Sequence, residues 1–347
     1  MIYQIIEKVF IIYILALIIK GLNMTGFIDW IIRPVNRIKN IKHIFLFWFL
    51  IGAVVSSVFT DLTTALILLP IQILYMEKAN ITQNKELLLI TLCFGIMAGG
   101  DLTMFGGGDN LVAVGLYKEF YNSDFTNLMW VKYMLPVTLL SMTVTFTAIY
   151  PFIKNEHITY VKEETRSKIK KYPTFILLYS IVCVFLKYYI PAYLLVFVAY
   201  LDMKKPKGMF ENIPYKPMAI WTLAFLFGKI VGSIILTHVD ISVLNGISSN
   251  YIFAVLCGIT ILTTIFCTNT ATASGVMGIY MSLFPANPLM FVILLKCINV
   301  GYLMIYHNTC LAVGNGYGIT QKSLLKVGFA VTILQIMVIW SYARLLR

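Results

Sequence analysis

Four polar or glycine-rich stretches interrupt the apolar runs of this sequence: Thr60–Asp61, Gly99–Asn110, Cys267–Gly275 and Tyr306–Gly318. Threonine hydroxyls, asparagine amides and the carbonyls of unwound glycine-rich backbone are oxygen ligands of the kind that hold sodium ions. Helix N-termini in such stretches carry partial positive charge and suit a carboxylate or another oxyanion. The alternative is that the small residues only let helices pack closely. Because the stretches form two similar pairs, we favour binding of a cation and an anion.

The runs between these stretches are typical of a membrane protein. The chain has 347 residues, 59% of them hydrophobic and 12% charged, and its mean hydropathy is +0.84. A soluble domain has roughly 45–50% apolar and about 25% charged residues, and a helix needs about 20 mostly apolar residues to cross a bilayer. Apolar runs lie at Ile44–Phe59, Leu135–Phe152, Tyr172–Val198, Met218–Leu236, Tyr251–Phe266 and Pro288–Met304. The composition predicts an all-α polytopic membrane protein and excludes a soluble domain on one anchor.

The net charge of +12 would indicate nucleic-acid binding in a soluble protein. Here the basic residues gather in three loops, as the positive-inside rule predicts for cytoplasmic loops of a cell (plasma or inner) membrane protein. These residues are Arg33, Arg37, Lys39 and Lys42; Lys154, Lys162, Arg166, Lys168, Lys170 and Lys171; and Lys204, Lys205, Lys207 and Lys216. We therefore expect a lipid bilayer and no nucleic acid as partner. The six cysteines form no CxxC pair and are interpreted as buried hydrophobic residues.

Several apolar runs are interrupted in their middle, and the interruptions come in the same order twice. The interrupted runs are Ile44–Tyr75, Leu87–Tyr117, Tyr251–Phe284 and Pro288–Gly318. Asn110–Gly115 (NLVAVG) and Thr309–Gly314 (TCLAVG) also share letters. Broken helices at membrane depth occur where the freed backbone lines a cavity or is covered by protein. Paired interrupted segments in two halves indicate an inverted-repeat transporter with two re-entrant hairpins and two broken transmembrane helices.

This interpretation divides the chain into four parts. Residues 1–43 hold an N-terminal span and a basic loop; the apolar stretch Val9–Leu22 has no small-residue cleavage site after it and is expected to be retained. Residues 44–153 form the first repeat, with a hairpin at 44–75, a broken helix at 87–117 and a span at 129–153. Residues 154–216 hold basic loops and linking spans. Residues 217–347 form the second repeat, with a hairpin at 251–284, a broken helix at 288–318 and a span at 324–343. All basic loops then face the cytoplasm.

The motifs at the interruptions resemble those of the divalent-anion:sodium symporter family, within the wider ion-transporter superfamily. TNTATASG at Thr268–Gly275 is similar to the Ser-Asn-Thr signature of that family, and TDLTTALILLPI at Thr60–Ile71 is similar to its first-half counterpart. The stretch Gly99–Gly115 resembles the family pattern of spaced glycine, threonine and asparagine residues. HNTCLAVGNGYG resembles the second-half counterpart, so that the resemblance covers about residues 44–347.

The resemblance implies two sodium sites, each built from a hairpin tip and the adjacent broken-helix turn, with an anion bound between the tips. The first cation site would hold Thr60, Asp61, Gly106 and Asn110. The second would hold Thr268, Asn269, Thr270 and Gly314, with Thr309 as a further candidate. The anion would lie near Asp61, Asn110, Asn269, Thr270 and Thr309. It also implies an elevator-type motion and a homodimer as a candidate assembly.

The sequence departs from the family pattern at Asp61, where the family has asparagine. A carboxylate at the bilayer midplane costs several kcal/mol unless it is paired, bound to a cation or protonated. Asp61 is therefore a candidate carrier of a proton or cation. The paired prolines of the family are also absent, because Gly107, Gly108 and Asp109 occupy the first turn. Thr309 stands where the family has its second asparagine.

Three further ionisable residues lie within or beside apolar runs. Lys229 and Lys296 are candidate charge partners of Asp61, Asp101 or Asp109. Alternatively, either ammonium could supply affinity for an anion or replace one sodium ion. His307 is the histidine nearest to a tip and is a candidate for contact with substrate or proton, against a hydrogen-bonded structural role.

The sequence thus predicts a secondary active transporter that moves a small anion, dicarboxylate-like or an inorganic oxyanion, coupled to sodium or protons, with no other cofactor. A cation/proton antiporter or metalloid exporter of the same superfamily is the first alternative, favoured by Asp61. A non-transporting assembly or enzyme subunit is the second. An enzyme is less well supported, because the intramembrane polar residues are threonine, asparagine and glycine with isolated Asp and Lys, and no nucleotide-binding loop occurs.

Overall fold

A computed structural model describes residues 2–27, 30, 35, 38–104, 106–122, 125–156, 158, 169–185, 188–205 and 248–345. Across these residues the chain is helical, without strands. Four of the helices are long and apolar enough to cross a membrane: Ile41–Val58, Leu128–Phe152, Ser249–Phe266 and Gln321–Arg344. The predicted all-helical membrane architecture is confirmed. The predicted span Met218–Leu236, and with it Lys229, lies outside the described residues.

The first group of helices follows the predicted order of segments. Helices α3 (Ile41–Val58) and α4 (Asp61–Lys78) meet at Phe59–Thr60, which we call the first break. Helices α5 (Lys85–Gly100) and α6 (Gly108–Tyr121) are separated by the first turn, residues 101–107. Helix α7 (Asn127–Ile149) continues into the short 3-10 helix η2 (Tyr150–Phe152).

A second group repeats this order of elements. Helices α11 (Ser249–Phe266) and α12 (Asn269–Leu283) meet at Cys267–Thr268, the second break. Helices α13 (Pro288–Ile298) and α14 (Thr309–Gly316) are separated by the second turn, residues 299–308. The long helix α15 (Gln321–Leu345) ends the described chain.

The two breaks have the same backbone conformation. Phe59 and Cys267, the last residues before each break, are both extended, with φ/ψ of −116°/153° and −119°/164°. Thr60 and Thr268 are extended as well and form the N-caps of α4 and α12. Two consecutive extended residues end a helix because they cannot continue the i to i−4 hydrogen bonds. The two breaks therefore place the N-termini of α4 and α12 inside the protein.

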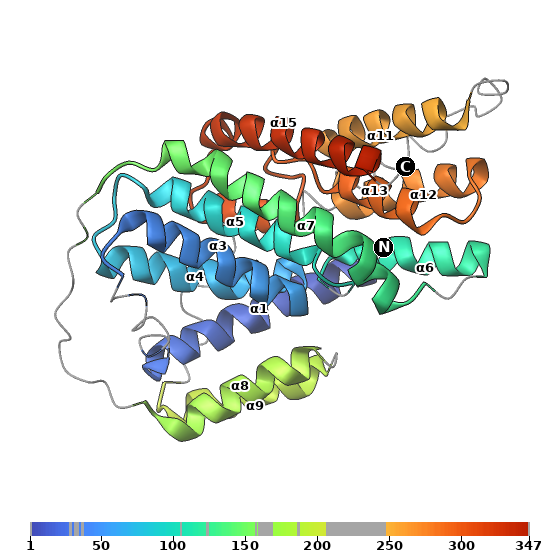
Figure 1. Cartoon of the computed structure of the whole chain (residues 1–347). Helices are drawn as coiled ribbons and strands as arrows, with labels where there is room; N and C mark the ends of the chain where they lie inside the picture. The colour runs from blue at the N-terminus through green and yellow to red at the C-terminus, as the bar shows by residue number, and fades with distance from the viewer. Residues whose placement is uncertain are drawn as a thin grey trace.

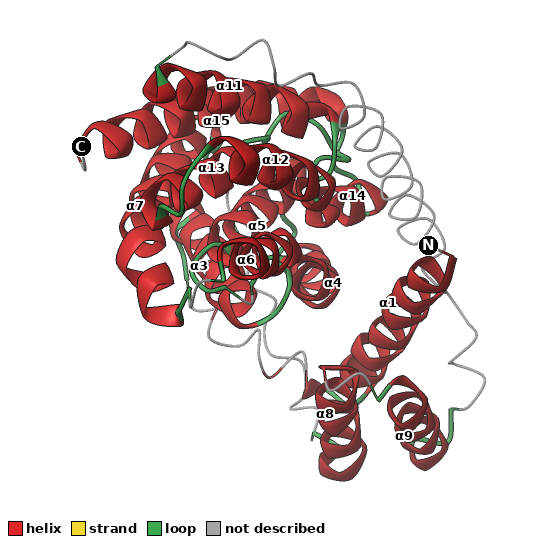
Figure 2. Cartoon of the chain, turned by 90° about the vertical axis from the view of Figure 1, so that its right-hand side faces the viewer, coloured by secondary structure: helices red, strands yellow, loops and turns green. Residues whose placement is uncertain are grey.

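Helices α1 (Ile2–Met24), α8 (Lys171–Phe185) and α9 (Tyr189–Asp202) form a separate layer at one side of the molecule (Figures 1 and 2). Its inner contacts are apolar, with Ile14, Leu17 and Ala199 all buried. The hydroxyl of Tyr200 donates to the carbonyl of Leu17 at 2.9 Å and fastens α9 to α1. This layer reaches the first group mainly through α1 and α4.

Small residues bring α5 very close to α3. A Cβ atom added at Gly95 would lie 2.2 Å from the carbonyl oxygen of Phe49, and one at Gly99 would lie 2.2 Å from the Cα of Ala53. The spacing of four residues places both glycines on one face of α5, as in small-xxx-small contacts between membrane helices. Viewed end-on, α5 lies in the middle of the bundle (Figure 2), and this close contact fixes the position of its C-terminus, where the first turn begins.

A carboxylate fixes the loop that precedes α5. Glu156 accepts hydrogen bonds from the backbone amides of Thr82 at 2.7 Å, Gln83 at 2.9 Å and Asn84 at 3.2 Å. Burial alone would raise the pKa of Glu156, but these donors together lower it below its ordinary value. The N-terminus of α5 is therefore tied to the segment that follows η2.

We expect the stabilisation from Glu156 to depend on pH in one direction. Because its pKa is lowered in the folded protein, the contribution is complete above the ordinary glutamate pKa and is lost as the pH falls through the lowered value. Glu156→Gln should unfold at a lower temperature than wild type at neutral pH. The two melting temperatures should converge on acidification. A constant difference across this pH range would contradict the assignment.

Candidate functional site

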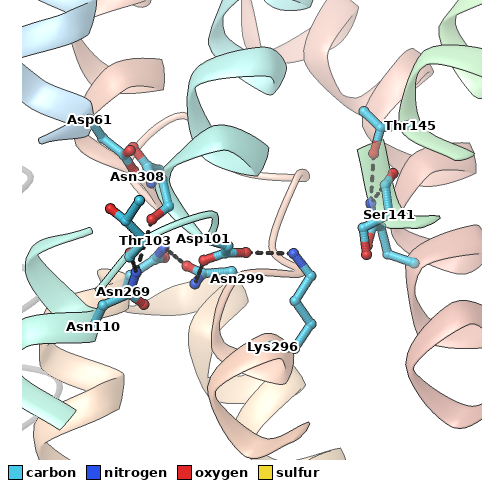
Figure 3. Close-up of polar contacts among 12 residues, drawn as sticks. Asp61, Asp101, Thr103, Asn110, Ser141, Thr145, Asn269, Lys296, Asn299 and Asn308 are labelled. Carbon is cyan, nitrogen blue, oxygen red and sulfur yellow. Dashed lines mark hydrogen bonds and ion pairs between the residues drawn. The ribbon is translucent and has the colours of Figure 1, made fainter. Parts of the chain in front are cut away.

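The first break is bound to the second turn through Asp61. This residue is the first of α4, and its carboxylate is almost fully buried. Ser56, at the end of α3, donates to Oδ1 at 2.8 Å, and the amide of Asn308 donates to Oδ2 at 2.8 Å. Asn308 is also the N-cap of α14, where its Oδ1 accepts from the backbone amide of Cys310 at 2.9 Å. One asparagine thus caps a helix of the second group and holds a carboxylate of the first (Figure 3).

The second break is bound to the first turn through a chain of side chains. The Nδ2 group of Asn269, the first residue of α12, donates to Oδ1 of Asn299. The Nδ2 group of Asn299 donates to Oδ1 of Asp101 at 2.7 Å, and the ammonium of Lys296 donates to Oδ2 of Asp101 at 2.5 Å. Figure 3 places these four residues in one line. The first break therefore contacts the second turn directly, whereas the second break reaches the first turn through Asn299 of its own group.

The first turn folds directly over the first break. The hydroxyl of Thr103 donates to the carbonyl of Ser57, and Nδ2 of Asn110 donates to the carbonyls of Gly100 and Thr103 at 3.0 and 3.3 Å. A Cβ atom on Gly106 would lie 2.5 Å from the carbonyl oxygen of Gly100 and 2.6 Å from that of Ser56. Only glycine fits at this position, where the carbonyl oxygens of Gly100 and Ser56 both approach the Cα.

Several buried oxygen atoms at this cluster have no hydrogen-bond donor. They are Oδ2 of Asp109, Oδ1 of Asn110 and Oδ1 of Asn269. A buried acceptor without a donor costs about 1–3 kcal/mol, so native proteins pair such atoms with a ligand, an ion or water. These atoms are oxygen ligands of the predicted kind. Among the described residues, no basic side chain forms an ion pair with Asp61 or Asp109.

The remaining predicted residues lie around this cluster at different distances. Thr270 follows Asn269 in α12 and faces α6, since a Cβ on Gly108 would lie 3.9 Å from its hydroxyl. The hydroxyls of Thr60 and Thr63 are 3.1 Å apart, and Thr268 accepts from the amide of Ala271. Thr268 thus caps α12 with its side chain, whereas Thr60 begins α4 without a side-chain capping bond.

The side chain of His307 and the Cα of Gly314 face other parts of the bundle, although the carbonyl of His307 accepts from the backbone amide of Asn269 at 3.3 Å. The Nδ1 atom of His307 donates to the carbonyl of Thr264 at 2.6 Å, and its ring lies against Gly301, where a Cβ would come within 2.4 Å. This contact supports the structural interpretation of His307. Thr309 begins α14 beside Asn308. Gly314 faces Cys93 of α5 and Ile319, where it allows close helix packing.

Ser56, Asn299 and Asn308 are site residues that were not predicted from the sequence. Ser56 and Asn308 donate hydrogen bonds to the carboxylate of Asp61, and Asn299 donates one to the carboxylate of Asp101. A polar residue at the end of an apolar run was the available signal, as in Asn299 after Lys296–Ile298. Their partners lie far away in the sequence, so spacing alone could not reveal them.

The described chain has apolar helices of membrane length, and they enclose a buried polar cluster built from helix breaks and turns. This combination is typical of an integral membrane protein of the transporter class. A sequence model of the citrate transporter family matches residues 3–296. The chain belongs to this family, which is part of the ion-transporter superfamily and is related to the divalent-anion:sodium symporters. The predicted relationship to this group of transporters is thereby confirmed. No curated protein matches the sequence.

Proposed function

We propose that the chain is a secondary active transporter that moves a small anion, with citrate and related carboxylates as first candidates, coupled to sodium or protons. Membership of the citrate transporter family supports the substrate class. The observation that carries the proposal is the pair of crossed contacts, Asp61 with Asn308 and Asn269 through Asn299 with Asp101. They gather carboxylates, amides and two helix N-termini in the interior, where a cation and an anion can bind side by side.

The two groups of helices are proposed to be inverted repeats, and α3–α4 and α11–α12 to be re-entrant hairpins. Three features support this. The order of elements is the same in both groups, and the two breaks have matching backbone conformations. In Figure 1, α3 and α4 extend from their break toward one end of the molecule, and α11 and α12 extend toward the other. Packing is also reciprocal, since α4 lies on α14 and α12 lies on α6.

The cation sites are proposed to lie at the two breaks. The first comprises Thr60, Asp61, Gly106 and Asn110; the second comprises Thr268, Asn269, Thr270 and Gly314, with Thr309 as a further candidate. The unpartnered amide oxygens of Asn110 and Asn269 support ligand roles at these places. The anion is proposed to lie between the N-termini of α4 and α12, which favour negative charge. An elevator-type movement, cytoplasmic basic loops and a homodimer belong to the same proposal.

A substrate screen in proteoliposomes tests the proposal. Labelled citrate, succinate and sulfate are offered in turn, with an inward sodium gradient, an inward proton gradient or neither. We expect one anion to accumulate only when a cation gradient is imposed. No accumulation of any anion under any gradient would overturn the proposal.

An antiporter or metalloid exporter is the second candidate, because the Asp61 carboxylate has no basic partner among the described residues. A carboxylate held by neutral donors can exchange a proton for a cation. Acidification of the vesicle interior driven by an outward sodium gradient, without any anion, would favour this candidate over anion uptake.

We expect Asn269→Ala to reduce transport about tenfold or more, because it removes an unpartnered ligand oxygen and the link to Asn299. Uptake rates in proteoliposomes give the measure. Ser274→Ala is the matched control, since Ser274 lies on the same helix, is exposed and donates only to the carbonyl of Thr270. Equal uptake by wild type and Asn269→Ala, with unchanged ion dependence, would show that the site is assigned wrongly.

A further inference from the structure

Lys296 is a buried ammonium group inside an otherwise apolar helix. It lies in α13, where the neighbouring Leu295 and Cys297 are also buried. Its side chain and that of Asp101 are each only 2% exposed, and their charged atoms are 2.5 Å apart. Asp101 also accepts from Asn299, which in turn accepts from Asn269 of the second break. The ammonium therefore lies in a cluster of oxygen atoms that connects both groups of helices.

Stability alone does not account for this pair. A buried ion pair often stabilises a protein no more than apolar residues of similar volume. Nor does the pair suit the binding of an anion, because Asp101 neutralises the positive charge and the ammonium is hidden from solvent. The ammonium instead occupies the position of a cation bound among oxygen atoms, with the Asp101 carboxylate as its main ligand.

We propose that the Lys296 ammonium is a built-in cation, which fills a cation site at Asp101 and Asn299 so that this site takes no free ion. This inference deepens the proposed function, since it rests on free-ion sites elsewhere in the same cluster. Three buried aspartates, Asp61, Asp101 and Asp109, surround the breaks and turns. Of these, Asp101 carries its counter-charge on the chain, whereas Asp61 and Asp109 have no basic partner among the described residues. Free cations are then expected at the two proposed sites at the breaks, and not at Asp101.

Removing the ammonium should open the site to sodium. In Lys296→Met and Lys296→Gln, the Asp101 carboxylate keeps Asn299 but loses its counter-charge. We expect each variant to bind one additional sodium ion per chain, measured with radioactive sodium on purified protein. We also expect the Tm of each variant to rise when choline is replaced by sodium. This rise should be about 2–4 °C larger than the corresponding rise for wild type.

Two controls separate this site from the others. Lys296→Arg keeps the positive charge, and the double variant Asp101→Asn/Lys296→Met removes both charges. Both should bind as many sodium ions as wild type. Equal sodium binding by Lys296→Met, Lys296→Gln and wild type would overturn the proposal. If only the double variant can be purified, whatever the sodium concentration, Lys296 is a structural counter-charge and the proposal is equally overturned.

Sodium binding is counted without transport, so this test and that of the proposed function can fail separately. A wild-type protein that moves no anion contradicts the proposed function, but the difference in sodium binding between wild type and Lys296→Met still decides the role of Lys296. Conversely, anion transport by wild type together with unchanged sodium binding by the variants contradicts only the built-in cation.

Discussion

Asp61→Asn is expected to reduce cation-coupled transport about 10- to 100-fold, while the protein still folds. The substitution preserves the shape of the side chain, and an amide oxygen can accept from Asn308 as the carboxylate does. What it removes is the negative charge in the interior. A hydrogen bond to a charged group contributes about 1.5–3 kcal/mol, which corresponds to roughly one to two powers of ten. Uptake in proteoliposomes, normalised to folded protein, measures the loss.

The partner of Asp61 offers a rescue. Asn308 lies 2.8 Å from the carboxylate and caps α14, and aspartate caps a helix as well as asparagine does. Asp61→Asn/Asn308→Asp therefore moves the charge by one hydrogen bond while keeping the cap of α14. We expect partial recovery of coupled transport in the double variant. Recovery is not expected from Asn308→Ala in the Asp61→Asn background. Wild-type transport by Asp61→Asn alone would remove this residue from the mechanism.

Gly99→Ala is expected to destabilise the protein by about 2 kcal/mol or more. Its new methyl group would lie 2.2 Å from backbone atoms of Ala53, which cannot rotate away as a side chain can. Overpacking costs about 1–3 kcal/mol and occasionally more, and a clash with backbone atoms falls at or above the upper end of this range. Subtracting the gain of about 1 kcal/mol from the better helix propensity of alanine leaves the expected loss. Thermal unfolding in detergent should show a clear fall in Tm, and Gly95→Ala should behave alike.

A glycine in open surroundings provides the control for this effect. Gly258, in α11, has no atom within 4 Å of its added Cβ. Gly258→Ala should leave the Tm unchanged or raise it, because only the propensity term applies. If Gly99→Ala were as stable as Gly258→Ala, the close contact of α3 and α5 could not be as the structure describes it.

Much of the helical arrangement was predictable from the order of apolar and polar residues. The polar residues Thr60–Asp61 within an apolar run predicted the first break, and Thr268–Asn269 predicted the second. Helices at membrane depth are interrupted where the freed backbone lines a cavity or is covered by protein. Glycines at 99, 100 and 106 predicted the first turn for the same reason. Interruption is a local property of the chain, so the sequence carries it directly.

The partners within the cluster could not be predicted in the same way. Lys296 had three candidate carboxylates, and only the packing of α13 against the first turn selects Asp101. Asn308 was not singled out from the sequence, yet its amide donates to the Asp61 carboxylate across 247 positions of sequence. Such pairings depend on how the two groups of helices meet, which has no periodic signal. The roles of all these residues in binding stay predictions.

The crossed contacts have a mechanical consequence. Asp61 cannot move away from Asn308, nor Asp101 from Asn299, without breaking a buried hydrogen bond. A displacement of one group of helices relative to the other would leave these atoms without partners in an environment without water, at a cost of about 1–3 kcal/mol for each. In the proposed elevator-type movement, α4, α12 and the two turns should therefore travel as one rigid body. The sliding surface is then expected along the apolar contacts with the layer of α1, α8 and α9.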